Sequence, residues 1–191
     1  MISIGITGII GSGKSMLSQV FRSMDIPVYD ADTNAKLLMN NNLQLRDSLI
    51  KEFGAETYLN GKINKEYLRN VVFGDEKKRQ IVNSIVHPAV KDDFIAWRQT
   101  TGKEITAIES AIIFDANLED ILDKIIFVEA AEDILVRRIC FRDNVSEEIA
   151  INKIKLQRKN SGREKCDAIF INDRNHSLIE QAEIFINNLK H

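Results

Sequence analysis

Residues 8 to 15 have the sequence Gly-Ile-Ile-Gly-Ser-Gly-Lys-Ser and match the pattern G-x-x-x-x-G-K-[ST] at every specified position. Such a glycine-rich loop curls so that its N–H groups face phosphate oxygens, and the following helix adds the positive end of its dipole. Alternating residues 2–7 predict a strand before the loop, and the apolar face of 14–23 predicts a helix after it. Chance produces this pattern in roughly one chain of this length in a hundred. We therefore interpret it as a phosphate-binding loop.

Each residue type in the loop has a predicted task. Lys14 reaches the β- and γ-phosphates as a catalytic point charge, and the Ser15 hydroxyl is a predicted Mg²⁺ ligand. The predicted nucleotide-binding residues here are Gly8, Gly11, Ser12, Gly13, Lys14, Ser15 and Met16. The expected cofactors are therefore ATP and Mg²⁺. The loop alone does not distinguish a GTPase, an ATPase motor and a small-molecule kinase.

The rest of the chain predicts strands that alternate with helices. Apolar runs indicate strands at 27–29, 104–109, 124–128 and 168–171. The middle two are expected to be followed by helical segments, and an amphipathic helix is expected at about 177–189. This alternation predicts an α/β fold with a parallel sheet covered on both faces. Ligands bind at the carboxyl ends of such strands. The residues expected there are Gly8, Asp30, Glu109 and Glu129.

Absent signals narrow the class of protein. No Asn-Lys-x-Asp sequence follows the loop, and 191 residues leave little room for the further machinery of a motor. The net charge of −2 excludes a generally basic nucleic-acid coat, and apolar runs of four residues are far too short for the roughly 20 of a membrane helix. The first residues lack the features of a secretory signal, so we expect a cytoplasmic protein. Cys140 and Cys166 are expected to be buried apolar residues. A small-molecule kinase is favoured, and no motif points to an obligatory protein partner.

Two aspartates follow the second predicted strand. Asp32 is the candidate that positions or deprotonates an acceptor hydroxyl, and Asp30 is the candidate nearer the Mg²⁺ shell. The alternative is that they cap a helix that starts near Thr33, a task that aspartate performs well.

Positive charge is concentrated in residues 134–165, which hold nine basic and four acidic side chains, a net +5. Arg138 and Arg142 are four residues apart, so on a helix they share one face and could both contact ATP phosphates from a closing lid. A solvated surface is the alternative. Arg137 points elsewhere on the same helix and is expected to be structural.

Several different short motifs are distributed along nearly the whole chain. They are residues 5–15, Asp30-Ala31-Asp32, Leu68-Arg69 with Phe73, Ile85-Val86-His87-Pro88, residues 109–114, Arg138 to Asp143, and Gln157 with Asp167 and Asn172. In order and spacing they resemble the dephospho-coenzyme A kinase family, which phosphorylates the ribose 3′-hydroxyl of dephospho-coenzyme A in the last step of coenzyme A synthesis.

The resemblance implies a P-loop NTPase fold of three α/β/α layers with three parts. The nucleotide-binding core would comprise 1–31, 101–133 and 166–191, the helical acceptor domain 32–100, and the helical lid 134–165.

The resemblance also implies roles for single residues. Asp32 would be the catalytic base, and Arg69, His87 and Pro88 would bind the acceptor. A capped helix start before Pro88 is the alternative for His87. Glu109 would contact magnesium or the acceptor, or would be structural. Independently of the resemblance, the loop at 172–175, which begins at Asn172, is the candidate for adenine contact because it would follow the last strand beside the phosphate loop.

Departures from the family pattern concern details of the site. A third glycine is usual where Ile9 or Ile10 stands, and a threonine where Met16 stands. Leu135 and Cys166 replace a usual glutamine and alanine, and Gly162-Arg163 replaces a lysine-rich approach to the final strand. The rival hypotheses are another small-molecule or nucleoside monophosphate kinase on the same fold, a non-catalytic nucleotide switch, and RNA binding, which lacks aromatic support beyond Phe141.

Overall fold

The computed structural model describes residues 1–159 and 161–189. The contacts divide the chain into two compact units, Met1–Tyr29 with Thr101–His191, and Asp30–Thr100. The predicted lid, 134–165, falls within the first unit, and its residue 160 lies outside the described residues, as do residues 190 and 191 of the predicted core. The roles predicted for these parts remain predictions.

The first unit is built on strands and the helices that connect them. Its strands are β1 (Ile2–Thr7), β2 (Val28–Asp30), which reaches the unit boundary, β5 (Ile105–Glu109), β6 (Lys124–Glu129) and β7 (Ala168–Ile171). Its α-helices are α1 (Lys14–Ser23), α6 (Glu132–Asp143), α7 (Glu147–Arg158) and α8 (Leu178–Leu189). The sheet has the order β2-β5-β1-β6-β7. Each predicted strand is therefore present, within one or two residues of its expected bounds.

Parallel pairing aligns the carboxyl ends of the strands. β1 pairs in parallel with β5, where Ile6 lies opposite Glu109, and with β6, where Thr7 lies opposite Phe127. β6 pairs in parallel with β7, where Glu129 lies opposite Ile171. The chain leaves the central strand β1 directly into the loop at Gly8, between its two neighbours. This places the loop at the edge where parallel α/β sheets bind ligands.

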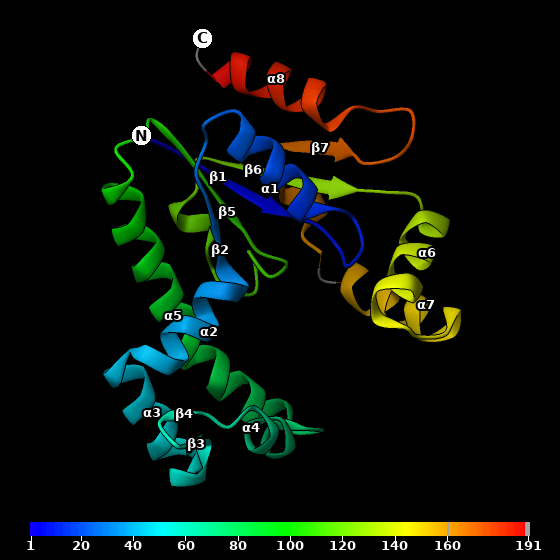
Figure 1. Ribbon diagram of the computed structural model, residues 1–191. Coiled ribbons are helices and arrows are strands. Elements are labelled where there is room, and N and C mark those ends of the chain that lie inside the picture. Colours follow the sequence, from blue (N-terminus) through cyan, green and yellow to red (C-terminus); the bar gives the residue numbers. More distant parts are fainter. Residues whose placement is uncertain (160, 190–191) are drawn as a thin grey trace. The chain divides into compact units, whose positions relative to one another are not determined.

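Both faces of the sheet are covered, so the predicted three-layer α/β/α architecture is confirmed (Figure 1). Alternate side chains of β1 and β6, such as Ile4 and Ile126, are fully buried against α1 and α8. The face that α1 buries includes Leu17 and Phe21, as its periodicity predicts. On the opposite face, Phe127 packs in a second cluster with α6 and α7.

The segment after β5 differs from the prediction of a helix. Residues 111–117 form turns, and only a short 3₁₀ helix, Glu119–Ile121, precedes β6. Asn117 has φ +48°, a left-handed conformation that interrupts helical continuation. Ile113 and Leu122 nevertheless cover the sheet, because their Cδ1 atoms lie within 2.8 Å of where a Cβ on Gly5 would be. Turns therefore provide the apolar cover that a helix was expected to provide.

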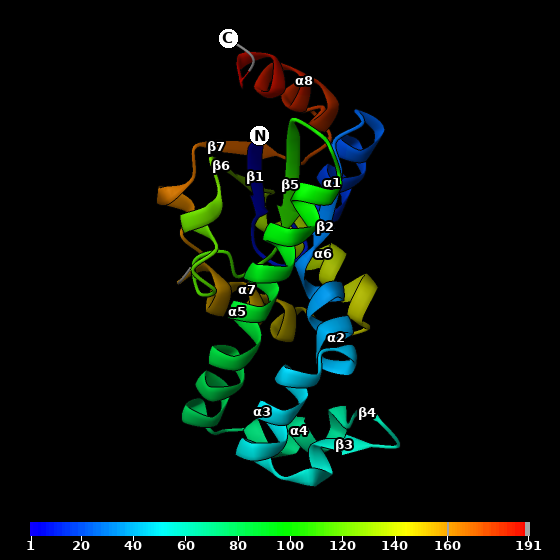
Figure 2. The same ribbon diagram turned by 90° about the vertical axis from the view of Figure 1, so that its left-hand side faces the viewer.

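The second unit is mainly helical, as predicted, but contains a hairpin that the prediction missed (Figure 2). Its elements are α2 (Ala31–Asn41), α3 (Leu43–Phe53), the 3₁₀ helix Ala55–Thr57, β3 (Tyr58–Leu59), β4 (Lys62–Ile63), α4 (Lys65–Val72) and α5 (Glu76–Thr100). Asn60 and Gly61 join the two strands with φ +51° and +79°. An Asn-Gly pair is the usual two-residue hairpin turn, so the signal was present in the sequence.

The suggested helix start before Pro88 is wrong. Pro88 lies inside α5, which begins twelve residues earlier at Glu76 and continues to Thr100. Proline lacks the N–H that would bond to the carbonyl of Ser84, so this turn of the helix loses one regular bond. Burial of Val86, Val90 and Phe94 on one face of α5 offsets that loss.

Cys140 and Cys166 are half-buried free thiols that pack on the α6–α7 cluster, so they are less buried than expected. Burial raises the pKa of the Cys166 thiol to about 11, with smaller contributions from Asp167 and Glu164. Among the described helices, none combines the length and apolar character that a membrane crossing requires.

Candidate active site

The loop between β1 and α1 presents an uncapped helix N-terminus. Gly13 is the N-cap residue of α1, with φ +98°, and in the described chain no side chain caps this helix. By contrast, α2, α3, α4 and α7 are each capped by an Asp, Asn or Ser side chain. The first turn of α1 also contains no acidic residue. The backbone N–H groups of the first turn of α1 are therefore available to bind an anion.

Two of the predicted loop glycines have no room for a side chain. A Cβ on Gly8 would lie 2.4 Å from the carbonyl oxygen of Val128, and a Cβ on Gly13 would lie 1.9 Å from Nδ2 of Asn172. Both glycines also have positive φ angles, +145° and +98°. The close approach of the Val128 backbone at Gly8 and of the Asn172 side chain at Gly13, rather than local turn preference alone, therefore requires glycine at both positions.

The polar groups of the loop fit a phosphate cradle. Lys14 Nζ donates to the carbonyl oxygens of Gly8 and Ile9, at 2.9 and 3.3 Å, which places the ammonium group over the loop. The fully buried Ser12 Oγ finds no hydrogen-bond partner among the described residues. Ser15 and Met16, the next predicted contacts, are exposed at the start of α1. A buried hydroxyl without a partner and an ammonium group over the same loop are suited to an anionic ligand.

Arg138 and Asn172 both contact the loop through its backbone carbonyl groups. Arg138 Nη1 donates to the carbonyl oxygens of Gly11 and Ser12, at 3.1 and 3.3 Å, and its Nη2 donates to that of Asn172 at 3.3 Å. Asn172 is 5% exposed, and its Nδ2 donates to the Ser12 carbonyl at 2.7 Å. Asn172 thus supports the loop from the carboxyl end of β7, and its contact with adenine remains a prediction.

The second predicted arginine makes a different contact. Arg142 Nε donates to Oδ1 of Asp143 at 2.8 Å, and Lys153 Nζ lies 2.9 Å from Oδ2 of the same carboxylate. Hydrogen bonds from these two cations hold the pKa of Asp143 well below its usual range. Arg142 therefore shares a helix with Arg138 but is directed to a carboxylate, and its contact with ATP remains a prediction.

Ion pairs neutralise other cations of the basic segment. Arg158 pairs with Glu132, and Arg163 Nη2 lies 2.8 Å from Oε2 of Glu129 at the carboxyl end of β6. Hydrogen bonds and the charge of Glu129 raise the pKa of Arg163. Arg137, predicted to be structural, is exposed on α6. The net positive charge of the segment is thus partly neutralised within the unit.

Glu109 lies at the carboxyl end of β5 and anchors α1. Ser18, fully buried and one turn after Lys14, donates from Oγ to Oε2 of Glu109 at 2.6 Å. This contact is structural, and the magnesium or acceptor contact of Glu109 remains a prediction. Sequence reasoning missed Ser18. A small polar residue on the otherwise apolar face of a phosphate-loop helix was the available signal.

Asp30 and Asp32 belong to the second unit and differ in their surroundings. Asp30 caps α2: its Oδ1 accepts from the Thr33 N–H at 2.9 Å and its Oδ2 accepts from the Thr33 hydroxyl at 2.8 Å. The capping alternative is thus present for Asp30, and its Mg²⁺ role remains a prediction. Asp32 is exposed in the first turn of α2, where its negative carboxylate interacts favourably with the positive end of the helix dipole.

The predicted acceptor residues of the second unit occupy different helices. Arg69 is exposed on α4, and His87 and Pro88 lie on α5. A hollow of about 580 Å³ in this unit is formed by α2, α3 and α5. Of the predicted acceptor residues, Pro88 is among the described residues that line this hollow. Polar residues that also line it include Asn42, Ser84 and Asp92.

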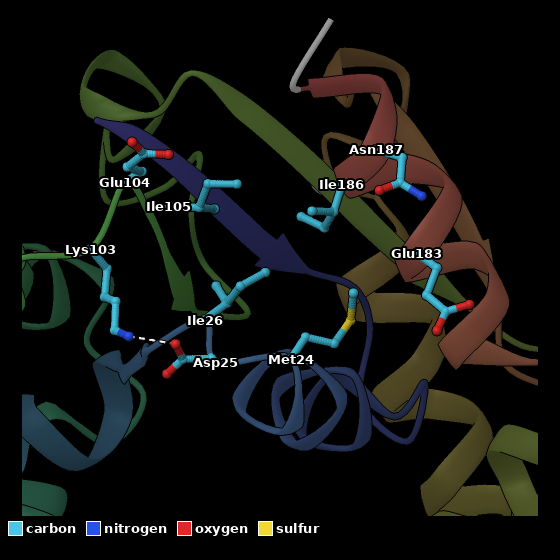
Figure 3. Close-up of a pocket in the computed structure, with 9 residues that line it drawn as sticks. All are labelled: Met24, Asp25, Ile26, Lys103, Glu104, Ile105, Glu183, Ile186 and Asn187. Carbon is cyan, nitrogen blue, oxygen red and sulfur yellow. Dashed lines mark hydrogen bonds and ion pairs between the residues drawn. The ribbon is translucent and has the colours of Figure 1, made fainter.

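The hollow drawn in Figure 3, of about 480 Å³, lies at the opposite edge of the sheet from the phosphate loop. It is lined by Met24, Asp25, Ile26, Lys103, Glu104, Ile105, Glu183, Ile186 and Asn187. These residues surround the amino end of β5, whereas the loop follows the carboxyl end of β1. This hollow is therefore not the nucleotide site.

No group of three or more His, Cys, Asp or Glu residues among those described could hold a metal ion unaided. A magnesium ion in phosphoryl-transfer sites relies on one or two protein oxygens and on phosphate oxygens. The exposed Ser15 hydroxyl beside the uncapped end of α1 fits that arrangement.

The sequence and the fold of the chain are both similar to those of known proteins. The family model for dephospho-CoA kinase matches residues 2–178. A curated dephospho-CoA kinase of Porphyromonas gingivalis is 36% identical over 184 residues, covering 95% of this chain and 91% of its own. The crystal structure of TT1252 from Thermus thermophilus is 25% identical with a TM-score of 0.81, covering 98% of this chain and 96% of that one. A dephospho-CoA kinase from Campylobacter jejuni, 22% identical with a TM-score of 0.70 and the same two coverages, shares the fold.

Proposed function

The chain belongs to the dephospho-CoA kinase family, and we propose that it transfers the γ-phosphate of ATP to the ribose 3′-hydroxyl of dephospho-coenzyme A, giving coenzyme A and ADP. The observation that carries the proposal is the phosphate loop: an uncapped helix N-terminus, glycines without room for a Cβ, and an ammonium group over the loop. That the acceptor is a small molecule is inferred from membership of the family.

The loop residues would act on the phosphates mainly by positioning and charge stabilisation. Lys14, which now donates to loop carbonyls, would turn to the β- and γ-phosphates. Mg²⁺ would neutralise charge on these phosphates, with Ser15 and, as a further candidate, Asp30 as the residues that hold it. Arg138 is within hydrogen-bond distance of the loop and would neutralise charge on the transferring group. Arg142 would join it only after leaving Asp143.

The acceptor hydroxyl requires a carboxylate that orients it and accepts its proton. We assign this role to Asp32, whose exposed position on α2 supports it. Arg69, His87 and Pro88 would hold the acceptor, and residues 32–100, which lie within the second unit, would form the acceptor domain. Residues 134–165 would form the lid, and the cytoplasm would be the site of action.

The decisive experiment measures ADP release from ATP and Mg²⁺ with dephospho-coenzyme A, with AMP, adenosine and no acceptor as controls, and identifies the product by mass. Coenzyme A as product, with little turnover in the controls, supports the proposal. Turnover with another acceptor only would replace it with a different kinase on the same fold. ATP binding without turnover would favour a nucleotide switch.

Asp32→Asn tests the catalytic base. The change should lower kcat at least about a hundredfold, the scale of general acid–base assistance. Asp47→Asn is the matched control, because Asp47 is another exposed helical aspartate of the same unit. Equal kcat values in the two variants would remove Asp32 from the mechanism.

A further inference from the structure

The phosphate loop contains a turn whose first central N–H has no partner within the turn. The Ser12 N–H donates to the Ile9 carbonyl at 3.1 Å, so Ile10 and Gly11 are the central residues of a four-residue turn. Gly11 has φ +80°, which is typical of the second central residue of a type II turn. The N–H of the first central residue must then find an acceptor outside the turn.

Gln157, on α7, supplies that acceptor. Its Oε1 accepts from the Ile10 N–H at 2.6 Å, a contact that spans 147 residues of sequence. The Gln157 side chain is exposed, but its helix is anchored, because Ala150 and Ile154 on α7 are fully buried in the cluster that also contains Ile9. The acceptor is therefore held in place by the packing of α7 against the loop.

The other side of the turn is held by α6. The Gly11 carbonyl accepts from Arg138, and a Cβ on Gly11 would lie 3.2 Å from Cγ1 of Ile139. Two neighbouring helices thus bind the N–H of one central residue and the carbonyl of the other. This arrangement determines the orientation of the peptide groups that lead into the N-terminus of α1.

We propose that Gln157 is a positioning residue for ATP: it holds the Ile10 N–H so that the turn, and the N–H groups after it, are oriented before phosphate binds. The inference rests on the proposed kinase activity of the same loop. Without this bond the turn can rotate its peptide groups, and ATP binding must then include the cost of ordering them. The bond therefore acts on ATP affinity and leaves acceptor affinity unchanged.

Gln157→Met tests the role, because methionine keeps the length of the side chain and loses the amide acceptor. The loss of one neutral hydrogen bond should raise the Kd for a non-hydrolysable ATP analogue with Mg²⁺, measured by calorimetry, about two- to tenfold. KM for ATP should rise in parallel, with KM for dephospho-coenzyme A unchanged. Gln99→Met, at an exposed glutamine of α5, is the matched control and should leave both the Kd for the analogue and the KM for ATP unchanged.

Two further variants separate positioning from general stability. Gln157→Asn keeps an amide that is too short to reach Ile10 and should behave as Gln157→Met. Gln157→Glu keeps an acceptor oxygen of the same reach and should recover most of the affinity at about 0.3 M salt, where added charge is screened. Unchanged analogue affinity in folded Met and Asn variants would overturn the proposal, as would equal losses in the Met and Glu variants. The binding assay needs no acceptor, so its outcome is independent of whether coenzyme A is the product.

Discussion

Replacing Gly13 by alanine should destabilise the fold more than the same change at Gly102. Both glycines have positive φ angles, +98° and +64°, so both variants force a Cβ into a left-handed conformation that costs about 1–2 kcal/mol. A Cβ on Gly102 would have no heavy atom within 4 Å. Strain should therefore be the whole cost at Gly102, which makes it the matched control.

The added cost at Gly13 comes from Asn172. The new Cβ would lie 1.9 Å from Nδ2 of this buried side chain, which would have to move and release the 2.7 Å hydrogen bond to the Ser12 carbonyl. Leaving a buried polar group without its partner costs about 1–3 kcal/mol. The free energy of unfolding should therefore fall by about 2–5 kcal/mol in Gly13→Ala, against about 1–2 kcal/mol in Gly102→Ala.

Urea unfolding followed by far-ultraviolet circular dichroism measures both losses. The double variant Gly13→Ala/Asn172→Ala gives the methyl group its space, so its loss should be smaller than the sum of the single losses by about 1 kcal/mol or more. Equal losses at Gly13 and Gly102, or strict additivity with Asn172→Ala, would refute the steric argument. ATP binding by Gly13→Ala should also fail, because the shifted loop carries the phosphate N–H groups.

Three other predictions concern single contacts. The cationic partners of Asp143 favour its ionised form, so the stability that they add is present above its ordinary pKa of about 3.9 and is lost as the pH falls through lower values. In Asp143→Asn, the urea midpoint should therefore fall less between about pH 6 and pH 2 than it does in the unchanged protein. In a Cys140→Ala variant, iodoacetamide should modify Cys166 slowly at about pH 8 and faster as the pH approaches its pKa of about 11, and alkylation as fast as that of the unfolded chain would contradict its burial. Ser18→Ala and Glu109→Gln should each lower the unfolding free energy by about 1–3 kcal/mol, and the double variant by less than their sum.

Local patterns predicted much of the nucleotide-binding unit. Residues 8–15 carry their chemistry in consecutive positions, and the periodicity of α1 identifies its buried face without any distant contact. Strands buried on both faces are mainly apolar, so β5 and β6 were recognisable from their local sequence. The edge strand β7 is also apolar throughout, although Ile169 is exposed.

The errors arose where two signals competed. Asn60-Gly61 indicates a hairpin, but it lies within residues 32–100, which were expected to be helical. Pro88 suggests a helix start, but burial along α5 outweighs the one backbone bond that proline removes. After β5, apolar residues at helical spacing cover the sheet from turns.

The sequence by itself determined the family, the phosphate loop and the order of strands and helices, because these depend on residues that are close together in the chain. Only the tertiary structure decided which side chains meet that loop. Asn172, Arg138 and Gln157 reach it from 126 to 160 residues away through bonds to backbone atoms, which any residue could supply. Backbone groups carry no residue-specific signal, so packing had to bring these partners together before their contacts could be recognised.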